Sequence, residues 1–347
     1  MTTMTNNGMT DTTAIERIAV IGGGSWGTAL AGRLAANGND TVLWAYEPEL
    51  VAEINSSHTN SLYLPGINLH PTLECTGDLS DAVAGRSIVL LVTPVQVMRG
   101  VLKQLASFIA PNAIIANASK GIELETLQTV SQICGDILGD SALERYVALS
   151  GPTFAREVAQ ELPSLIVAAS RNATASQRVQ AAFSCPCLRV YTNSDVVGVE
   201  LGGAVKNVIA IAAGICDGLG FGYNARAALI TRGLAEMNRL GMAMGAQHAT
   251  FAGLAGMGDL VLTCTGDLSR NRTVGFKLGQ GMKLADILAE MRMVAEGVKS
   301  SESVYQLARR LGVEMPIVEK TYQILHEDKP ARQAVIELMA RDLKAEG

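Results

Sequence analysis

The first half of the chain alternates two patterns of apolar residues. Short, nearly continuous apolar runs rich in β-branched residues predict strands, and stretches with apolar residues at helical spacing follow them. Strands are expected at residues 15–21, 40–45, 87–93, 113–117, 146–150, 164–169 and 188–191, and helices at 25–37, 95–108, 126–138 and 153–160. This alternation is typical of a parallel sheet covered by helices on both faces.

From residue 196 onward the chain is rich in Ala, Gly, Leu and Met at helical spacing, and no strand is expected. Helices are predicted at residues 200–214, 225–242, 284–291, 300–311, 316–325 and 331–343. Pro316 and Pro330 stand where two of them start, a position that proline tolerates. The prediction is therefore an α/β fold, with a doubly wound parallel sheet at residues 15–195 and an all-helical C-terminal domain at 196–347.

Composition narrows the class of protein. A chain of 347 residues exceeds the usual size of one domain, in agreement with two. Its net charge of −5 argues against a nucleic-acid surface, which would need a basic face. The uncharged apolar run that follows Lys206, residues 208–216, is far shorter than the roughly 20 residues that cross a bilayer. We expect no nucleic-acid partner and no membrane insertion.

Residues 1–14 contain neither the apolar core nor the basic residues of a secretory signal, and they predict a disordered tail in a cytoplasmic protein. The six cysteines are scattered without a CxxC pair, which indicates reduced thiols. Cys185-Pro-Cys187 is the one close pair, and two ligands do not make a zinc site. No metal site is expected.

A glycine motif joins the first predicted strand to the first helix. Gly22 suits a tight turn, Gly24 lets a pyrophosphate approach the backbone, and Gly27 lets the helix pack on the strand. The helix N-terminus would supply amide donors and a positive dipole to the phosphates. A plain glycine turn is the alternative, but the strand–turn–helix context favours dinucleotide binding and a Rossmann-type sheet.

The end of the second strand bears on the choice between NAD and NADP. Glu47 follows the first glycine by about twenty-five residues. A carboxylate here favours the free 2′-hydroxyl of NAD, whereas an arginine would favour the phosphate of NADP. No arginine is present, but an outward-pointing Glu47 would have no influence, so the preference stays open at this stage.

Two more segments follow predicted strands at the carboxyl edge of the sheet, where doubly wound folds bind ligands. Lys120 comes after one strand, and Gly151 and Thr153 come after the next. A solvated lysine and a turn, with Thr153 as the N-cap of the next helix, are the alternative reading.

Ser269, Arg270 and Asn271 predict a site for an anion. Ser269 is a good N-cap, which would place Arg270 and Asn271 in the first turn of a helix with free backbone amides. A cation is unfavourable against the helix dipole at that end, and a bound anion would resolve the conflict. A solvated charge cluster is the alternative.

Lys206 lies in an otherwise apolar segment, residues 200–211, that is predicted to be helical. Lysine is rarely buried unless it is paired, and a desolvated amine has a lowered pKa. Gly202 and Gly203 on the same helix face would let a cofactor or substrate come close. A lysine that snorkels to the surface is the alternative.

Taken together, eight segments in register resemble the bacterial NAD(P)-dependent glycerol-3-phosphate dehydrogenase family. They are Gly-Gly-Gly-Ser-Trp-Gly-Thr-Ala-Leu at 22–30, Tyr-Leu-Pro-Gly at 63–66, Ser-Lys-Gly-Ile-Glu at 119–123, Leu-Ser-Gly-Pro-Thr-Phe-Ala at 149–155, Glu-Leu-Gly-Gly-Ala-Val-Lys-Asn-Val at 200–208, Gly-Met-Gly-Asp-Leu-Val-Leu-Thr-Cys at 256–264, Ser-Arg-Asn-Arg at 269–272 and Val-Ala-Glu-Gly at 294–297. The match runs from residue 18 to about 325.

The resemblance implies roles for individual residues. Lys206 matches the residue that transfers a proton at the carbinol oxygen. Positions on the substrate side are matched by Lys120, Gly151, Thr153, Lys206, Asp259, Ser269, Arg270 and Asn271. Positions on the cofactor side are matched by Ser25, Trp26, Tyr46, Lys120, Ala155, Arg270, Val294 and Glu296, and Tyr46 stands where relatives often carry His or Arg.

The activity that the resemblance implies is the interconversion of dihydroxyacetone phosphate and sn-glycerol 3-phosphate with NAD or NADP, which supplies glycerophospholipid synthesis. Two alternatives stay open: a related 2-hydroxyacid or 6-phosphogluconate-type dehydrogenase, and a dinucleotide sensor without catalysis. Apolar helical domains of this kind often form dimers, so a homodimer is compatible with the sequence.

Overall fold

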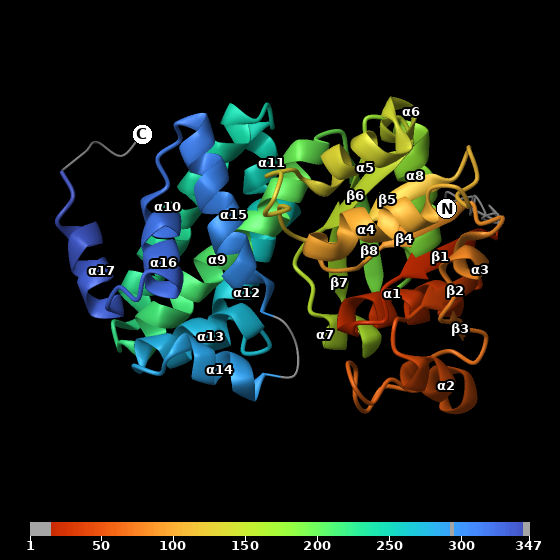
Figure 1. Cartoon of the computed structure of the whole chain (residues 1–347), viewed down its shortest axis with the longest axis horizontal. Coiled ribbons are helices and arrows are strands. Elements are labelled where there is room, and N and C mark those ends of the chain that lie inside the picture. Colours follow the sequence, from red (N-terminus) through yellow and green to blue (C-terminus); the bar gives the residue numbers. More distant parts are fainter. Residues whose placement is uncertain (1–14, 292–294, 343–347) are drawn as a thin grey trace, which may run out of the picture.

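The computed structural model describes residues 15–291 and 295–342, and within them it contains one eight-stranded sheet (Figure 1). The spatial order of the strands is β3-β2-β1-β4-β5-β6-β7-β8. Their bounds are β1 Arg17–Ile21, β2 Asp40–Trp44, β3 Glu74–Thr76, β4 Ile88–Leu91, β5 Ile114–Asn117, β6 Tyr146–Ser150, β7 Ser164–Ala169 and β8 Leu188–Asn193. The doubly wound fold is confirmed.

The prediction of an entirely parallel sheet is wrong at one pair of strands. β6 and β7 are antiparallel, with Leu149 opposite Ala168, whereas the other neighbours are parallel. The short helix α7 (Ala155–Ala159) joins these two strands without crossing over the sheet, so β7 returns beside β6 in the opposite direction. Strand β3 is missing from the prediction because its three residues are too few to show a pattern.

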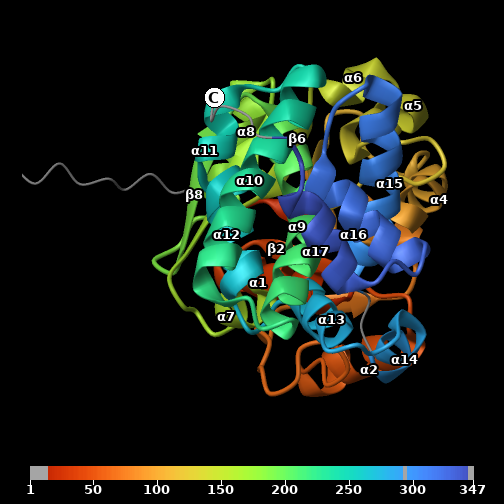
Figure 2. The ribbon, with the colours of Figure 1, turned by 90° about the vertical axis from the view of Figure 1, so that its left-hand side faces the viewer.

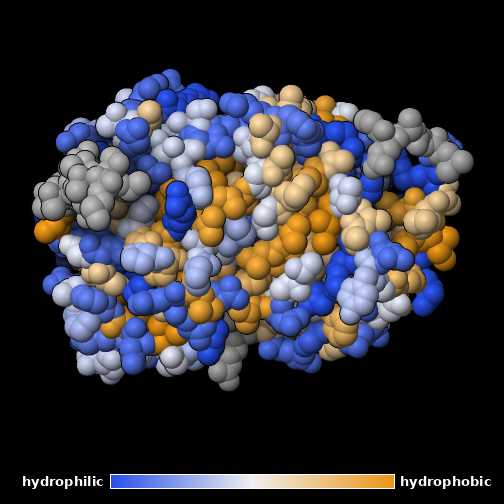
Figure 3. Space-filling model, turned by 180° about the vertical axis from the view of Figure 1, so that it is seen from behind, coloured by the Kyte–Doolittle hydropathy of each residue, from blue (hydrophilic) through white to orange (hydrophobic). Residues whose placement is uncertain are grey.

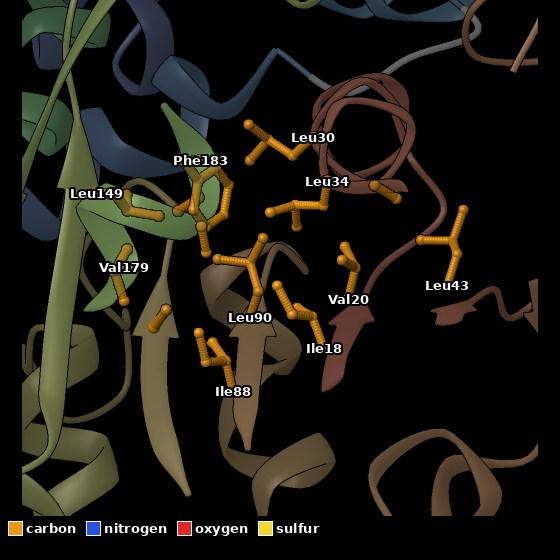
Figure 4. Close-up of a cluster of buried hydrophobic side chains, with 14 of the residues drawn as sticks. Ile18, Val20, Leu30, Leu34, Leu43, Ile88, Leu90, Leu149, Val179 and Phe183 are labelled. Carbon is orange, nitrogen blue, oxygen red and sulfur yellow. The ribbon is translucent and has the colours of Figure 1, made fainter. Parts of the chain in front are cut away.

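Helices cover both faces of the sheet because alternate strand residues point to opposite sides. Ile18 and Val20 of β1 pack in one apolar cluster, while Ala19 and Ile21 pack in the other. Figure 4 shows the first cluster between the strands and helices α1 and α8. The helices of this half are α1 Ser25–Ala36, α2 Pro48–Ser57, α3 Leu79–Val83, α4 Val95–Leu105, α5 Val130–Leu138, α6 Asp140–Leu143, α7 and α8 Ala173–Phe183.

The rest of the described chain is helical and is arranged around α9 (Val196–Gly218) (Figures 1 and 2). Its elements are α10 Gly222–Ala243, α11 His248–Ala252, the π-helical turn η1 Leu254–Gly258, α12 Asp259–Thr265, α13 Arg270–Gly279, α14 Leu284–Glu290, α15 Glu296–Leu311, α16 Pro316–His326 and α17 Ala331–Met339. Helix α9 is long and apolar enough to cross a membrane, yet 89% of its most apolar window is buried inside the protein. It is therefore a core helix.

Helices α9 and α13 touch through glycines on both sides. A Cβ atom at Gly214 of α9 would overlap the carbonyl oxygen of Arg272, and one at Gly275 of α13 would overlap that of Ile211. The same holds one turn further along, for Gly218 and Gly279. Since the two backbones are in direct contact, this glycine seam fixes the first turn of α13 relative to α9.

The N-terminal end of α9 is tied to the sheet by a buried carboxylate. Glu200 accepts hydrogen bonds from the hydroxyl of Tyr146 in β6 (2.5 Å) and from the backbone N–H and hydroxyl of Ser131 in α5 (2.8 and 2.6 Å). Burial raises the pKa of Glu200, and these donors oppose that rise. The sheet and the helical half thus share one polar network.

The predicted division at residue 195 stays a prediction, although the described strands all precede α9. The predicted disordered tail, residues 1–14, lies outside the described residues.

We expect Gly275→Ala to destabilise the protein, because the new methyl group meets a backbone atom that cannot swing aside. Overpacking of this kind costs about 1–3 kcal/mol, and urea unfolding followed by circular dichroism measures it. Gly100→Ala in α4 is the matched control, since a Cβ there has no neighbour within 4 Å and alanine improves helix propensity. Equal free energies of unfolding for the two variants would show that α9 and α13 can move apart to accommodate the methyl group.

Candidate active site

The glycine motif forms a turn that requires its glycines. Gly22 has φ +131°, and a Cβ there would lie 2.8 Å from the carbonyl oxygen of Val92. A Cβ at Gly27 would overlap the carbonyl oxygen of Gly22, so helix α1 packs directly on the turn. These two close approaches agree with the roles predicted for both residues.

The start of α1 leaves room for a phosphate. Gly24 is the N-cap, no side chain caps the helix, and a Cβ at Gly24 would meet nothing within 4 Å. The amides of the first turn therefore lie beside open space, with the positive end of the helix dipole behind them. In the same turn the indole Nε1 of Trp26 is buried without a hydrogen-bond partner in the described part of the chain. This cradle fits a dinucleotide pyrophosphate.

A cavity of about 350 Å³ lies between the sheet and the helices. It is lined from the sheet side by the starts of α1 and α7 and the loop after β5, and from the helical side by α9, α13 and the start of α15. The predicted site residues that line it are Ser25, Trp26, Lys120, Thr153, Ala155, Lys206, Ser269, Arg270, Asn271 and Glu296.

Two lysines at the cavity share one buried carboxylate. The ammonium of Lys206 pairs with Oδ1 of Asp259, and Nζ of Lys120 lies 3.1 Å from Oδ2 of the same side chain. Asp259 is fully buried and Lys206 is 4% exposed. Lys206 therefore does not snorkel to the surface but is a buried amine at the edge of a ligand-sized cavity.

This arrangement lowers the pKa of Lys206 to about 7. Burial is the largest cause, and repulsion from Lys120 adds to it, while the Asp259 carboxylate opposes both. For Lys120, burial acts to lower the pKa, but attraction to Asp259 raises it on balance. One carboxylate lies between two ammonium groups, so the cluster carries one excess positive charge. Of the two lysines, Lys206 therefore gives up its proton first.

Neighbouring groups hold the Asp259 side chain in place. The hydroxyl of Thr263 donates to the Asp259 carbonyl oxygen at 2.6 Å and lies 3.4 Å from Oδ1, while Ser150 of β6 lies 3.4 Å from Oδ2. Burial raises the pKa of Asp259, but the two lysines outweigh it and keep that pKa low. Asp259 follows directly on η1, and π-helical turns often occur at functional sites.

The expectation that Gly202 and Gly203 make room for a ligand is wrong. A Cβ at Gly202 would overlap the carbonyl oxygen of Ala255 in η1, and one at Gly203 would lie 3.3 Å from Cγ of Lys120. The protein itself occupies this space, since the small residues let η1 and Lys120 approach α9.

The predicted anion site has the expected helix start. The hydroxyl of Ser269 accepts a hydrogen bond from the N–H of Arg272 (3.2 Å), so Ser269 is the N-cap of α13. Oδ1 of Asn271 accepts from the N–H of Gly297 (2.9 Å), which ties α13 to the start of α15. Glu296 lies beside Arg270 at the cavity, and burial raises the pKa of its carboxyl group while Arg270 opposes that rise.

Some predicted residues lie away from the cavity wall. Tyr46 is 80% exposed, and its ring meets that of Trp44 edge-on, while Gly151 (φ +154°) is buried in the turn after β6. Thr153 does line the cavity, but it is not an N-cap: its hydroxyl donates to the carbonyl oxygen of Gly151 (3.2 Å), and Phe154 precedes α7 instead. Val294 lies outside the described residues.

The sequence patterns missed three polar residues at the site: Ser150, Thr263 and Asn207. The first two contact Asp259, and Asn207 lines the cavity beside Lys206. Ser150 stands at the end of a predicted strand and Thr263 one helical turn after Asp259. No local pattern indicated that either side chain would contact Asp259. Within the described ranges no group of three or more His, Cys, Asp or Glu residues is placed to hold a metal ion.

We expect Asp259→Asn to destabilise the protein strongly, because it leaves the buried ammonium group of Lys206 and the half-buried one of Lys120 without their counter-charge. Breaking a buried ion pair costs about 3–5 kcal/mol, measurable by urea unfolding at pH 7. The control is Asp267→Asn, since the side chain of Asp267 is 97% exposed and its ion pair with Arg272 lies at the surface. Wild-type stability of Asp259→Asn would mean that the lysines are not held by this carboxylate.

Comparison with known proteins gives a consistent result. Residues 17–176 match the model of the NAD-dependent glycerol-3-phosphate dehydrogenase N-terminus, and residues 195–336 match that of its C-terminus. Proteins called glycerol-3-phosphate dehydrogenase [NAD(P)+] are 72% identical over 330 residues in Trichlorobacter lovleyi and 66% identical over 331 residues in Geobacter sulfurreducens, in each case covering 95% of this chain and 99% of the relative.

A solved structure agrees. The crystal structure of glycerol-3-phosphate dehydrogenase from Coxiella burnetii superposes with a TM-score of 0.90 at 40% identity, covering 94% of this chain and 99% of that one. With both halves matched in order and 66–72% of the aligned residues identical in relatives that match along nearly their whole length, the chain belongs to the NAD-dependent glycerol-3-phosphate dehydrogenase family.

Proposed function

We propose that this protein interconverts dihydroxyacetone phosphate and sn-glycerol 3-phosphate with a nicotinamide dinucleotide, in the direction that supplies glycerophospholipid synthesis. The observation that carries the proposal is the buried Lys206, paired with Asp259 at the wall of a cavity that also receives Arg270 and the N-terminus of α13. A proton donor and an anion site in one cavity suit a phosphorylated ketone.

The chain's own residues would hold the cofactor at the carboxyl edge of the sheet. The turn from Gly22 to Gly27 and the amides of α1 would take the pyrophosphate, with Ser25 and Trp26 beside it. Lys120, Ala155, Arg270 and Glu296 line the same cavity further along. When bound, the reduced nicotinamide supplies the hydride for the ketone carbon.

The role of Lys206 is to move a proton at the substrate oxygen. As the carbonyl oxygen gains negative charge, Nζ of Lys206 donates its proton to that oxygen and becomes a neutral amine. Lys120 stays charged and stabilises the developing alkoxide through its positive potential. In the reverse direction, neutral Lys206 takes the hydroxyl proton. A pKa of about 7 lets the same amine act in both directions.

The first turn of α13 would bind the substrate phosphate. Arg270 lies at the positive end of the helix dipole, where a cation is unfavourable without a partner. A phosphate there would satisfy both the guanidinium group and the amides, with Ser269 and Asn271 alongside. Because the glycine seam fixes α13 on α9, the phosphate site is held at a constant distance from Lys206.

We expect Lys206→Ala to lower kcat for ketone reduction by about 10²–10⁴-fold, the usual contribution of general acid catalysis, while the Kd for NADH stays near that of the wild type. In the wild type, kcat for reduction should fall as pH rises through about 7, because the acid form of Lys206 is lost. This pH dependence should disappear in the variant. Near wild-type turnover would remove Lys206 from the mechanism.

Arg270→Ala is expected to raise KM for dihydroxyacetone phosphate by about tenfold or more, since charge-assisted contacts to phosphate are strong. Steady-state kinetics with dihydroxyacetone as the unphosphorylated comparison would measure the effect. Lys277→Ala removes a positive charge from the far end of the same helix, where Lys277 pairs with Glu290, and should change KM little. Equal use of dihydroxyacetone by the wild type would contradict the phosphate site.

We also propose a homodimer and a cytoplasmic location. The face seen from behind carries an apolar band (Figure 3), on which β7, β8, α11 and η1 line a groove of about 450 Å³. Tyr191 in β8 is 42% exposed there, next to the open edge of the sheet. A second copy would cover both the groove and the edge.

The proposed cytoplasmic location is supported by the cysteines. All six are free thiols, as is usual for proteins of a reducing compartment.

Sedimentation equilibrium tests the dimer. The wild type is expected at twice the 36.5 kDa of one chain, and Tyr191→Asp should shift the mass towards a monomer. Val97→Asp, which changes an exposed apolar residue of α4, is the control and should leave the dimer intact. A monomeric wild type at micromolar concentration would rule the dimer out.

A further inference from the structure

Cys185 and Cys187 face one another in the turn that joins α8 to β8. The N–H of Leu188 donates to the carbonyl oxygen of Cys185 at 3.2 Å, and the N–H of Cys185 donates to the carbonyl oxygen of Leu188 at 3.0 Å. These two bonds close a β-turn, and Pro186 stands at the turn position that proline favours because its φ is already fixed. The backbone is therefore held on both sides of the pair.

The turn brings the two sulfur atoms into contact. They lie 3.1 Å apart in a thiol hydrogen bond, so they need to approach one another by only about 1 Å to reach bonding distance. Both cysteines are partly exposed, and Pro186 between them is exposed. The pair is thus within reach of small molecules in solution.

One sulfur of the pair also contacts a cation. Nη1 of Arg33 in α1 donates to Sγ of Cys187 at 3.6 Å and forms an ion pair with Glu161 at 2.9 Å. The Arg33 side chain is 14% exposed and that of Glu161 is 63% exposed, so water screens the carboxylate more than the guanidinium group. Arg33 therefore presents a positive charge to Cys187.

These contacts assign different roles to the two sulfurs. Burial raises the pKa of the Cys185 thiol, and its hydrogen bond with Cys187 adds to that rise. A negative charge on the pair is therefore best placed on Cys187, where it would accept hydrogen bonds from both Arg33 and the Cys185 thiol.

The other four cysteines lack these properties. Cys75, Cys134, Cys216 and Cys264 are buried. Burial raises the pKa of all four thiols, to about 12 for Cys75 and Cys264 and to about 11 for Cys216. Since a thiol reacts as an accessible thiolate, these four are expected to be inert in the folded protein.

We infer that Cys185 and Cys187 form a redox-active dithiol, which a small-molecule disulfide such as oxidised glutathione converts reversibly into a disulfide within the turn. The pair does not line the cavity that contains Lys206. The inference is therefore independent of the proposed dehydrogenase activity and goes beyond it.

The reaction balances with one molecule of oxidant. The thiolate of Cys187 attacks one sulfur of oxidised glutathione, the bond between the two glutathione sulfurs breaks, and the first glutathione thiolate leaves. Cys185 then gives up its proton to solvent and its sulfur attacks Sγ of Cys187, so the second glutathione thiolate leaves. Each leaving thiolate takes up a proton, and the dithiol has passed two electrons to the oxidant.

The product is expected to be labile rather than structural. It would close a loop of three residues, 185–187, which is too short to restrict the unfolded chain much. Its sulfurs would be as accessible to reductants as the thiols are to oxidants, and exposed disulfides are the readily reduced ones. Small thiols should therefore restore the pair.

Thiol counting on the full-length protein tests the inference. Reduced wild type is incubated with oxidised glutathione at pH 7, quenched with acid, then unfolded and labelled with N-ethylmaleimide, and the labels are counted by intact-mass spectrometry. The reduced protein takes a label on each of its six cysteines. After oxidation it should take two fewer and carry no glutathione, peptide mapping should place the bond between Cys185 and Cys187, and dithiothreitol should restore the lost labels.

Two serine variants separate the roles of the sulfurs. Cys185→Ser keeps the sulfur that attacks but removes the one that resolves the mixed disulfide, so it should accumulate a glutathione adduct on Cys187. Cys187→Ser should react with oxidised glutathione about tenfold or more slowly than Cys185→Ser, because it lacks the thiolate beside Arg33. Circular dichroism checks the fold of both, and the thiol count of the wild type depends on neither.

The contribution of Arg33 has its own matched pair. Arg33→Gln should slow oxidation of the wild-type dithiol severalfold, since Cys187 loses its cation. Arg189→Gln removes the same charge two residues beyond Cys187, where the guanidinium group of Arg189 lies 5.2 Å from the centre of the Tyr191 ring, and should leave the rate unchanged. Equal slowing in both variants would overturn the role of Arg33.

Three results would overturn the redox-active pair itself: a full count of labels after oxidation, a glutathione adduct that persists on the wild type, or a disulfide mapped to another cysteine. Equal reaction rates for Cys185→Ser and Cys187→Ser would overturn the assignment of Cys187 as the attacking sulfur. A failure of the proposed function is distinguishable from all of these, because it would show as absent turnover of dihydroxyacetone phosphate by the reduced protein.

Discussion

The pairing of Asp259 with two lysines is the interaction on which the rest of the site depends. Removing one carboxylate and two ammonium groups from water costs several kcal/mol per ion and is offset only by close pairing and further hydrogen bonds. The Asp259 carboxylate pairs with Lys206 and Lys120, and the hydroxyls of Thr263 and Ser150 lie 3.4 Å from its two oxygens. One positive charge is left over, and this excess, together with burial, lowers the pKa of Lys206 into the range where proton transfer is useful.

Neither half of the chain can form this cluster alone. The loop after β5 supplies Lys120, while α9 supplies Lys206 and α12 supplies Asp259. The three meet because Glu200 ties α9 to β6, and because Gly202 lets η1 lie against α9. The glycine seam between α9 and α13 then sets the distance from the amine to the phosphate site. Packing of small residues thus controls the geometry of the charged ones.

Local patterns were enough to predict much of the fold but not the contacts between distant segments. Strands β6 and β7 begin and end at the predicted residues, and the N-cap at Ser269 is confirmed, because both depend on neighbouring residues only. The antiparallel β6–β7 pair, η1 and the ion pair between residues 206 and 259 depend on tertiary packing. Thr153 shows the limit of a local rule, since its hydroxyl donates to the carbonyl oxygen of Gly151 instead of accepting from an N–H of α7.

Nuclear magnetic resonance of protein labelled with ¹³C and ¹⁵N at the lysine side chains would test the central claim directly. The account predicts that one lysine titrates with a pKa near 7 and that its signal is absent from Lys206→Arg, while Lys120, whose pKa Asp259 raises, stays protonated through this range. Observation that every lysine, Lys206 included, stays protonated up to about pH 10 would contradict it.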